Sequence, residues 1–224
     1  MRASYQSSTP HKRDRFQTMQ RIQTLRLAAL ISCLMFVGPA AMAKGSAEAG
    51  QEKAATCAAC HGQDGNSLNP EWPSLAGQSE QYIVRALKAY RPNGTRNNPL
   101  MMGQVAALSD EDIQDLGAFF ASQARAPLTA DPDLVTAGER LYRGGNKDRG
   151  ISACIACHGP RGLGNPSAAY PAVAGQHATY TATSLRAYAK NERKSDPNQM
   201  MRNIASLLSD ADIAAVSSYI QGLE

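Results

Sequence analysis

The stretch Cys57-Ala58-Ala59-Cys60-His61 returns at an offset of 97 residues as Cys154-Ile155-Ala156-Cys157-His158. Two cysteines separated by two residues and followed at once by a histidine have the spacing of a c-type haem attachment motif. The cysteines bind the haem vinyl groups as thioethers, and the histidine becomes the proximal ligand of the iron. The repeat therefore predicts two covalent haem c groups, one on Cys57, Cys60 and His61, the other on Cys154, Cys157 and His158.

A zinc site, a disulfide and a thioredoxin-like redox pair are the other interpretations of such a motif. Zinc would need further Cys or His at ligand spacing, and none follows either motif. Of the five cysteines, four belong to the motifs, and Cys33 lies in a segment predicted to be removed. No disulfide is therefore needed.

Residues 1–43 are predicted to be a signal peptide. Arg26 precedes the apolar run Leu27–Val37, and Ala41-Met42-Ala43 has the form of a cleavage site, so the mature chain would start at Lys44. Met19 would open a signal peptide of ordinary length. Cleavage before a lipidated Cys33 is the alternative, but the apolar run continues past Cys33 to the better site. At about eleven residues the run is too short to span a bilayer, so we expect an exported, soluble protein.

The positive charge of the whole chain belongs to the predicted signal peptide. The chain carries 23 Lys and Arg against 19 Asp and Glu, but residues 44–224 carry 17 against 18. Haem propionates would make this part more negative still. Charge therefore gives no reason to expect binding to nucleic acid or to membranes.

Residues 44–224 consist of two copies of one unit. Leu75-Ala76-Gly77-Gln78 matches Val173-Ala174-Gly175-Gln176, and Leu108–Ile113 matches Leu208–Ile213. Pro127 and Pro132 lie in the polar stretch between the copies. We predict an all-α fold of two tandem cytochrome c-type haem domains, residues 44–126 and 134–224, joined by a linker at 127–133.

Each copy is predicted to contain helices joined by long loops. Ser109 and Ser209 are N-cap residues with Asp three positions later, as in a capping box. The helices that follow carry one apolar face each, formed by Ile113, Leu116, Phe119 and Phe120 and by Ile213, Val216, Tyr219 and Ile220. Shorter helices are predicted at 79–90 and 178–188, and one more before each motif. The Gly-rich and charged segment 143–150 is predicted to be a surface loop or hairpin.

The second iron ligand is predicted to be Met101 in the first copy and Met201 in the second. With the copies aligned on Leu-Ser-Asp, Met101 falls on Met201, whereas Met102 falls on Arg202 and Leu100 on Met200. Both methionines follow a proline, in loops expected to be extended. The alternative is that they only fill gaps in the core. His177 is interpreted as an ordinary polar residue, because its counterpart is Ser79 and one histidine cannot serve two haems.

Ligation by His and Met raises the reduction potential of a haem and leaves no position on the iron open. This argues against oxygen, peroxide or nitrite chemistry and favours an electron carrier. A dihaem peroxidase, which needs an open or switchable iron, is disfavoured for the same reason.

These motifs together resemble the dihaem cytochromes c4, two class I cytochrome c folds in tandem, over essentially the whole of residues 44–224. The resemblance implies a periplasmic, non-enzymatic, monomeric carrier with at most a peripheral association with the membrane. Its donor would be a quinol-oxidising complex, and its acceptor a terminal oxidase, such as one of the cbb3 type, or a reductase. It also implies that the carbonyl groups of Pro73 and Pro171 accept the ring N–H of the proximal histidines. Where the second copy has Leu141-Tyr142, the first has Ala54-Ala55, so its helix packing is expected to be lighter.

The alternative from the same resemblance is the dihaem subunit of a flavocytochrome c sulfide dehydrogenase. A neighbouring flavoprotein gene or co-purification with flavin would favour it.

Overall fold

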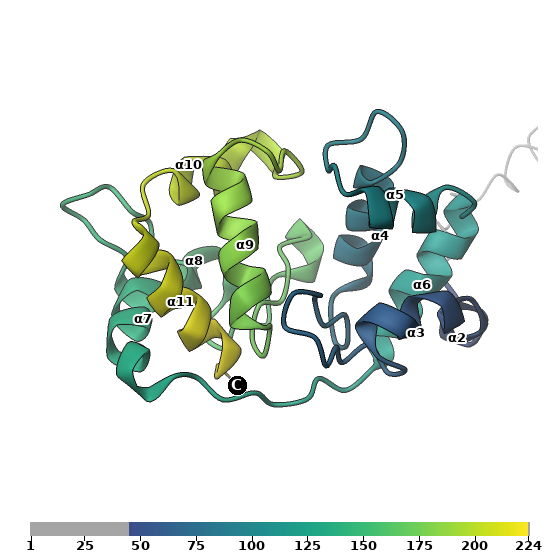
Figure 1. Cartoon of the computed structure of the whole chain (residues 1–224), viewed down its shortest axis with the longest axis horizontal. Helices are drawn as coiled ribbons and strands as arrows, with labels where there is room; N and C mark the ends of the chain where they lie inside the picture. The colour runs from purple at the N-terminus through teal and green to yellow at the C-terminus, as the bar shows by residue number, and fades with distance from the viewer. Residues whose placement is uncertain (1–44, 224) are drawn as a thin grey trace, which may run out of the picture. The chain divides into compact units, whose positions relative to one another are not determined.

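The computed structural model describes residues 45–223, and every regular element in this range is an α- or 3-10 helix (Figure 1). Its β-type pairing is limited to two isolated bridges, Asn146 with Ile151 and Asn165 with Tyr170. The prediction of an all-α fold is confirmed. No helix within 45–223 is long and apolar enough to cross a membrane. The predicted signal peptide, Met19 and Cys33 lie outside the described residues.

The first half is built on one central helix, α6, against which α2 and α4 pack (Figure 1). Its helices are α2 (Ala47–Lys53), α3 (Ala55–His61), α4 (Glu80–Ala89), α5 (Pro99–Val105) and α6 (Asp110–Ser122).

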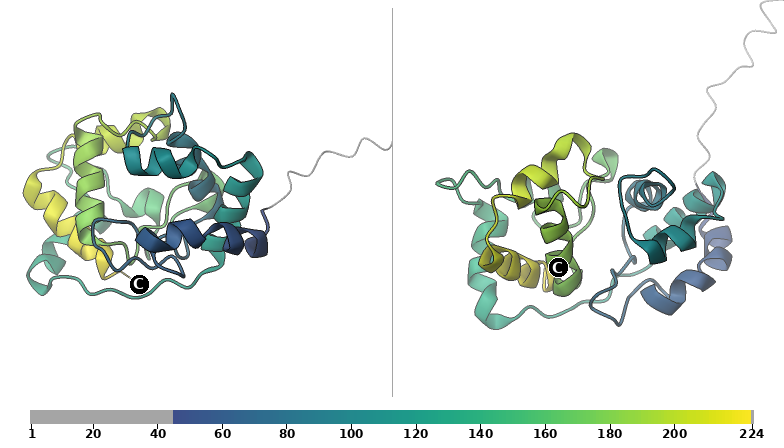
Figure 2. Two further views of the ribbon diagram at one scale, coloured as in Figure 1. Left: turned by 45° about the vertical axis from the view of Figure 1, so that its right-hand side comes forward. Right: turned by 45° about the horizontal axis from the view of Figure 1, so that its top comes forward.

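The second half repeats this plan around α11, which lies alongside α7 and α9 (Figure 2). Its elements are α7 (Pro132–Gly144), α8 (Ile155–His158), η1 (Pro166–Ala168), α9 (Ala178–Ala189), η2 (Pro197–Gln199), α10 (Met200–Ala205) and α11 (Asp210–Gln221). Backbone hydrogen bonds between Asn146 and Ile151 close a small hairpin in the segment predicted to be a loop or hairpin.

Both central helices begin with the predicted capping box. In α6 the Ser109 hydroxyl accepts from the backbone N–H of Asp112, whose carboxylate accepts from the N–H of Ser109; Ser209 and Asp212 do the same in α11. Each cap satisfies backbone donors that have no partner inside the helix. All eight residues of the predicted apolar faces are buried, so both central helices are oriented as the sequence predicts.

The second half has the heavier core. Tyr142 in α7 is fully buried at 0% exposure and packs with Leu141, Val216 and Tyr219. When Gly50 is aligned with Gly138, Ala54 matches Tyr142 and lies in the corresponding place of the first core. The lighter packing expected for the first half is therefore present in the structure.

Two expectations about prolines were wrong in detail. Met101 and Met201 lie in the short helices α5 and α10, not in extended loops. Pro99 occupies the first turn of α5, and the Asn98 side chain caps it by accepting from the N–H of Met101. Helix α7 begins at Pro132, so the end of the stretch expected as linker is helical. Proline is favoured in a first helical turn because its φ is already helical and its missing N–H is not needed there.

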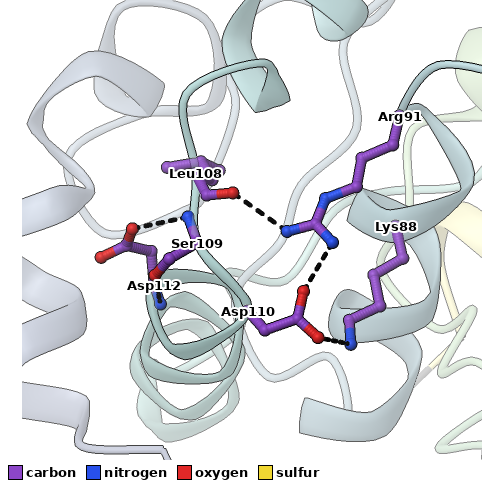
Figure 3. A network of polar contacts seen from close by, with 6 residues as sticks. All are labelled: Lys88, Arg91, Leu108, Ser109, Asp110 and Asp112. Atoms are coloured by element: carbon purple, nitrogen blue, oxygen red, sulfur yellow. Dashed lines mark hydrogen bonds and ion pairs between the residues drawn. The ribbon is translucent and has the colours of Figure 1, made fainter.

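Residues 91–108 carry Met101, and a network of charged side chains holds the two ends of this segment together (Figure 3). The carboxylate of Asp110 binds Lys88 at 2.6 Å and Arg91 at 2.5 Å. Arg91 also donates to the Leu108 carbonyl at 2.9 Å. Since Arg91 and Leu108 stand at the two ends of the loop, the network fixes both ends to the start of α6.

We expect Asp110→Asn to loosen this loop. Hydrogen bonds from Lys88 and then Arg91 lower the pKa of Asp110 below its ordinary value of 3.8. A carboxyl group with a lowered folded-state pKa contributes stability above its unfolded pKa and loses it as the pH falls through the folded value. The midpoint temperature of thermal unfolding, followed by circular dichroism, should therefore fall in the variant at pH 7. It should also depend less on pH below about 4 than in the wild type.

Glu111→Gln, in the same helical turn, is the control for this measurement. A melting temperature at pH 7 equal in Asp110→Asn and Glu111→Gln would contradict the role given to the network.

Candidate haem sites

The first motif is formed on a helix. Helix α3 carries Cys57 and Cys60 on adjacent turns and ends at His61, which is buried. Both cysteines are free thiols and half-buried. Burial raises the pKa of Cys57, which keeps it a protonated thiol at neutral pH. The short stretch from Cys57 to His61 thus carries two free thiols and one imidazole.

The second motif has the same donors on a shorter helix. Cys154 precedes α8, and Cys157 and His158 lie within it. Cys154 and Cys157 are free and half-buried, and burial raises the pKa of Cys154 to about 11. Cys154 and Met201 both pack against the core of the second half, whereas Cys57 packs against the first core.

Each motif histidine is held by a proline carbonyl group. The distance from Nδ1 to the carbonyl oxygen is 2.8 Å for His61 and Pro73, and 2.9 Å for His158 and Pro171. A carbonyl oxygen can only accept, so Nδ1 carries the proton and Nε2 keeps its lone pair. Burial lowers the pKa of both imidazoles, which are therefore neutral at pH 7. The expected contacts with Pro73 and Pro171 are confirmed.

The four methionines of residues 45–223 lie in unequal surroundings. Met101, Met200 and Met201 are all half-buried. Met102 is 36% exposed, and the Met200 sulfur already accepts a hydrogen bond from the Tyr170 hydroxyl at 3.7 Å.

His177 is buried and its Nε2 lies 2.8 Å from the carbonyl oxygen of Ser67, in the other half of the molecule. The ring is therefore engaged by the backbone, in keeping with its interpretation as an ordinary polar residue.

Sequence reasoning missed the role of two glutamines. Gln78 and Gln176 appear in the sequence only as the last letters of the repeated Leu-Ala-Gly-Gln and Val-Ala-Gly-Gln. In the structure each binds the backbone of the opposite half beside the proline that holds the motif histidine. Their repetition in both copies was the available signal.

The donor set of each site fits a covalent haem c. Thioether attachment uses two free thiols at this spacing, and the iron takes a neutral imidazole nitrogen whose other nitrogen is held by a hydrogen bond. Both halves provide these groups. The fold and the two sites together define a dihaem c-type cytochrome with haem c groups on both motifs.

Comparison with known proteins agrees with this class. The cytochrome c family model matches residues 47–124 and 135–224. Cytochrome c4 of Azotobacter vinelandii is 47% identical over 206 residues, covering 87% of this chain and 98% of that protein. The crystal structure of reduced recombinant cytochrome c4 from Pseudomonas stutzeri has a TM-score of 0.77 at 46% identity, covering 80% of this chain and 100% of that one. A protein of Stutzerimonas stutzeri named thiosulfate dehydrogenase electron acceptor is 38% identical, covering 74% of this chain and 78% of that protein.

The chain belongs to the cytochrome c4 family. It is thus a dihaem cytochrome of electron transfer.

Proposed function

We propose that this protein is exported to the periplasm as a monomer and carries electrons there, one per haem, without catalysing a reaction of its own. Its donor would be a quinol-oxidising complex and its acceptor a terminal oxidase, such as one of the cbb3 type, or a reductase. The observation that carries the proposal is the pair of motif imidazoles held by Pro73 and Pro171, the same arrangement in both halves.

In each half, separate residues would attach the haem and bind its iron. Haem supplies the one-electron chemistry, Fe(III) to Fe(II). Cys57 and Cys60, or Cys154 and Cys157, would attach it. His61 or His158 would bind the iron through Nε2, because Nδ1 is used by the proline carbonyl. That hydrogen bond fixes the orientation of the ring and raises its basicity as a ligand.

Met101 and Met201 would occupy the opposite face of each iron. The exposure of Met102 and the hydrogen bond that engages Met200 support this assignment. With both faces occupied, substrates have no vacant position on the iron. This supports a carrier over a peroxidase.

The proposal also concerns the kind of redox partner. The relatives reported above favour a soluble carrier over a flavocytochrome subunit. The likeness to a thiosulfate dehydrogenase electron acceptor adds a second candidate donor, a thiosulfate-oxidising enzyme.

Spectroelectrochemical titration of the exported holoprotein, combined with stopped-flow reduction, tests the function. We expect two one-electron waves, no carbon monoxide binding by the native reduced protein, and fast reduction by one of the two donors. Carbon monoxide binding at either iron would contradict a carrier with both positions filled. Fast reduction by a thiosulfate dehydrogenase alone would replace the quinol-oxidising complex as donor.

A further inference from the structure

Two glutamines reach from each half of the molecule into the other. The Gln78 amide donates to the Ala172 carbonyl at 2.8 Å and accepts from the Ala172 N–H at 2.9 Å. The Gln176 amide donates to the Ser74 carbonyl at 2.9 Å and accepts from the Ser74 N–H at 2.9 Å. Each side chain therefore satisfies both polar groups of one backbone residue in the opposite half.

The residues that the glutamines hold lie directly beside the histidine-binding prolines. Ser74 follows Pro73, and Ala172 follows Pro171. A continuous series of contacts therefore runs from Gln176 through Ser74 and Pro73 to the ring of His61. The series from Gln78 through Ala172 and Pro171 to His158 is its counterpart.

The proline segments depend on these contacts for their position. A proline has no N–H, so its own backbone can only accept hydrogen bonds. Gln78 and Ala172 are both buried, where a backbone donor or acceptor without a partner is costly. Removing the amide would leave the Ala172 N–H and carbonyl unpaired, and the segment would have to move to find new partners.

A second set of contacts joins the same halves without touching the prolines. Arg193 donates to the Tyr82 hydroxyl at 2.7 Å, and Arg96 donates to the Tyr180 hydroxyl at 3.3 Å. These bonds allow the effect of the glutamines to be separated from that of joining the halves in general.

We propose that Gln78 and Gln176 are positioning residues through which each half sets the histidine hydrogen bond of the other. The proposal rests on the assignment of His61 and His158 as iron ligands. A firm Nδ1–H···O bond makes the imidazole a stronger donor and so favours Fe(III). Loosening the bond should therefore raise the reduction potential of that haem, and the effect should cross from one half to the other.

The test compares Gln78→Met, Gln176→Met and Tyr82→Phe in the holoprotein. Methionine keeps approximately the length of glutamine and removes both hydrogen bonds to the opposite half. It also removes the bond that each glutamine accepts from the N–H of the next residue in its own half, Ser79 or His177. We expect Gln78→Met to raise the potential of the second haem and to shift or broaden the His158 Nδ1–H proton resonance, leaving the first haem unchanged. Gln176→Met should do the reverse. Tyr82→Phe should leave both potentials and both proton resonances unchanged.

Equal shifts at both haems, a shift only in the mutated half, or no shift would each overturn the proposal. Gln176 is only half-buried, so its variant keeps the test available if Gln78→Met does not fold. The proton NMR spectrum of the wild type distinguishes a failure of this proposal from a failure of the proposed function on which it rests. Absence of iron-bound histidine resonances there would refute the ligand assignment, whereas normal resonances without a crossed effect would refute only the glutamine coupling.

Discussion

Replacing Met101 by Ala is expected to abolish the methionine–iron absorption of the first haem, lower its potential and open its iron to carbon monoxide or cyanide. Met201→Ala should do the same to the second haem. The thioether is a weak donor that favours Fe(II), so its loss removes the stabilisation of the reduced state. Visible absorption, redox titration and carbon monoxide binding of each exported variant provide the measurements.

The neighbouring methionines are the matched controls. Met102→Ala and Met200→Ala should keep both iron sites closed and cost about 1 kcal/mol of stability at most. A neighbour could replace a lost ligand, so the double variants Met101→Ala with Met102→Ala, and Met200→Ala with Met201→Ala, complete the set. Opening of an iron by Met102→Ala or Met200→Ala alone would show that the ligand had been assigned one residue away.

Gly50→Ala and Gly138→Ala are expected to destabilise their halves severely. These equivalent glycines lie where α2 crosses α6 and α7 crosses α11. A Cβ on Gly50 would stand 2.1 Å from the carbonyl oxygen of Asp115, and one on Gly138 would stand 2.2 Å from that of Ala215. The obstacle in both cases is backbone, so the helices must separate. We expect a loss of about 3 kcal/mol or more, at the upper end of the cost of overpacking.

Gly144→Ala is the control, because it lies in the same helix α7 and its Cβ would meet nothing within 4 Å. Alanine there should be neutral or stabilising by up to about 1 kcal/mol. Urea unfolding of the holoproteins, followed by circular dichroism and haem absorption, measures the difference. If Gly138→Ala were as stable as Gly144→Ala, the close crossing of α7 and α11 would be wrong.

Local patterns in the sequence predicted the helices and the motifs well, because the interactions that form them are short-range. The capping boxes at Ser109 and Ser209 and the buried faces behind them depend on residues three or four positions apart. The short helix at Met101 was missed although its signal was present. Asn98 before Pro99 is a cap followed by a favourable first helical residue, but the same pair also occurs in turns.

The contacts between the halves could not be predicted in this way. Gln78 meets Ala172 at a separation of 94 residues, and Gln176 meets Ser74 at 102. No periodicity or spacing in the sequence specifies such a partner. The repeated glutamine shows that both copies retain an amide at this place, but only the folded chain shows which backbone it binds.

The contacts of the two glutamines are reciprocal. Gln78 meets Ala172 while its counterpart Gln176 meets Ser74, the counterpart of Ala172. This is the pattern of an isologous interface, as in a symmetric homodimer of single-haem ancestors. Fusing two such subunits makes their association intramolecular, so dilution no longer separates them. Fusion also frees equivalent positions to differ, as His177 and Ser79 now do.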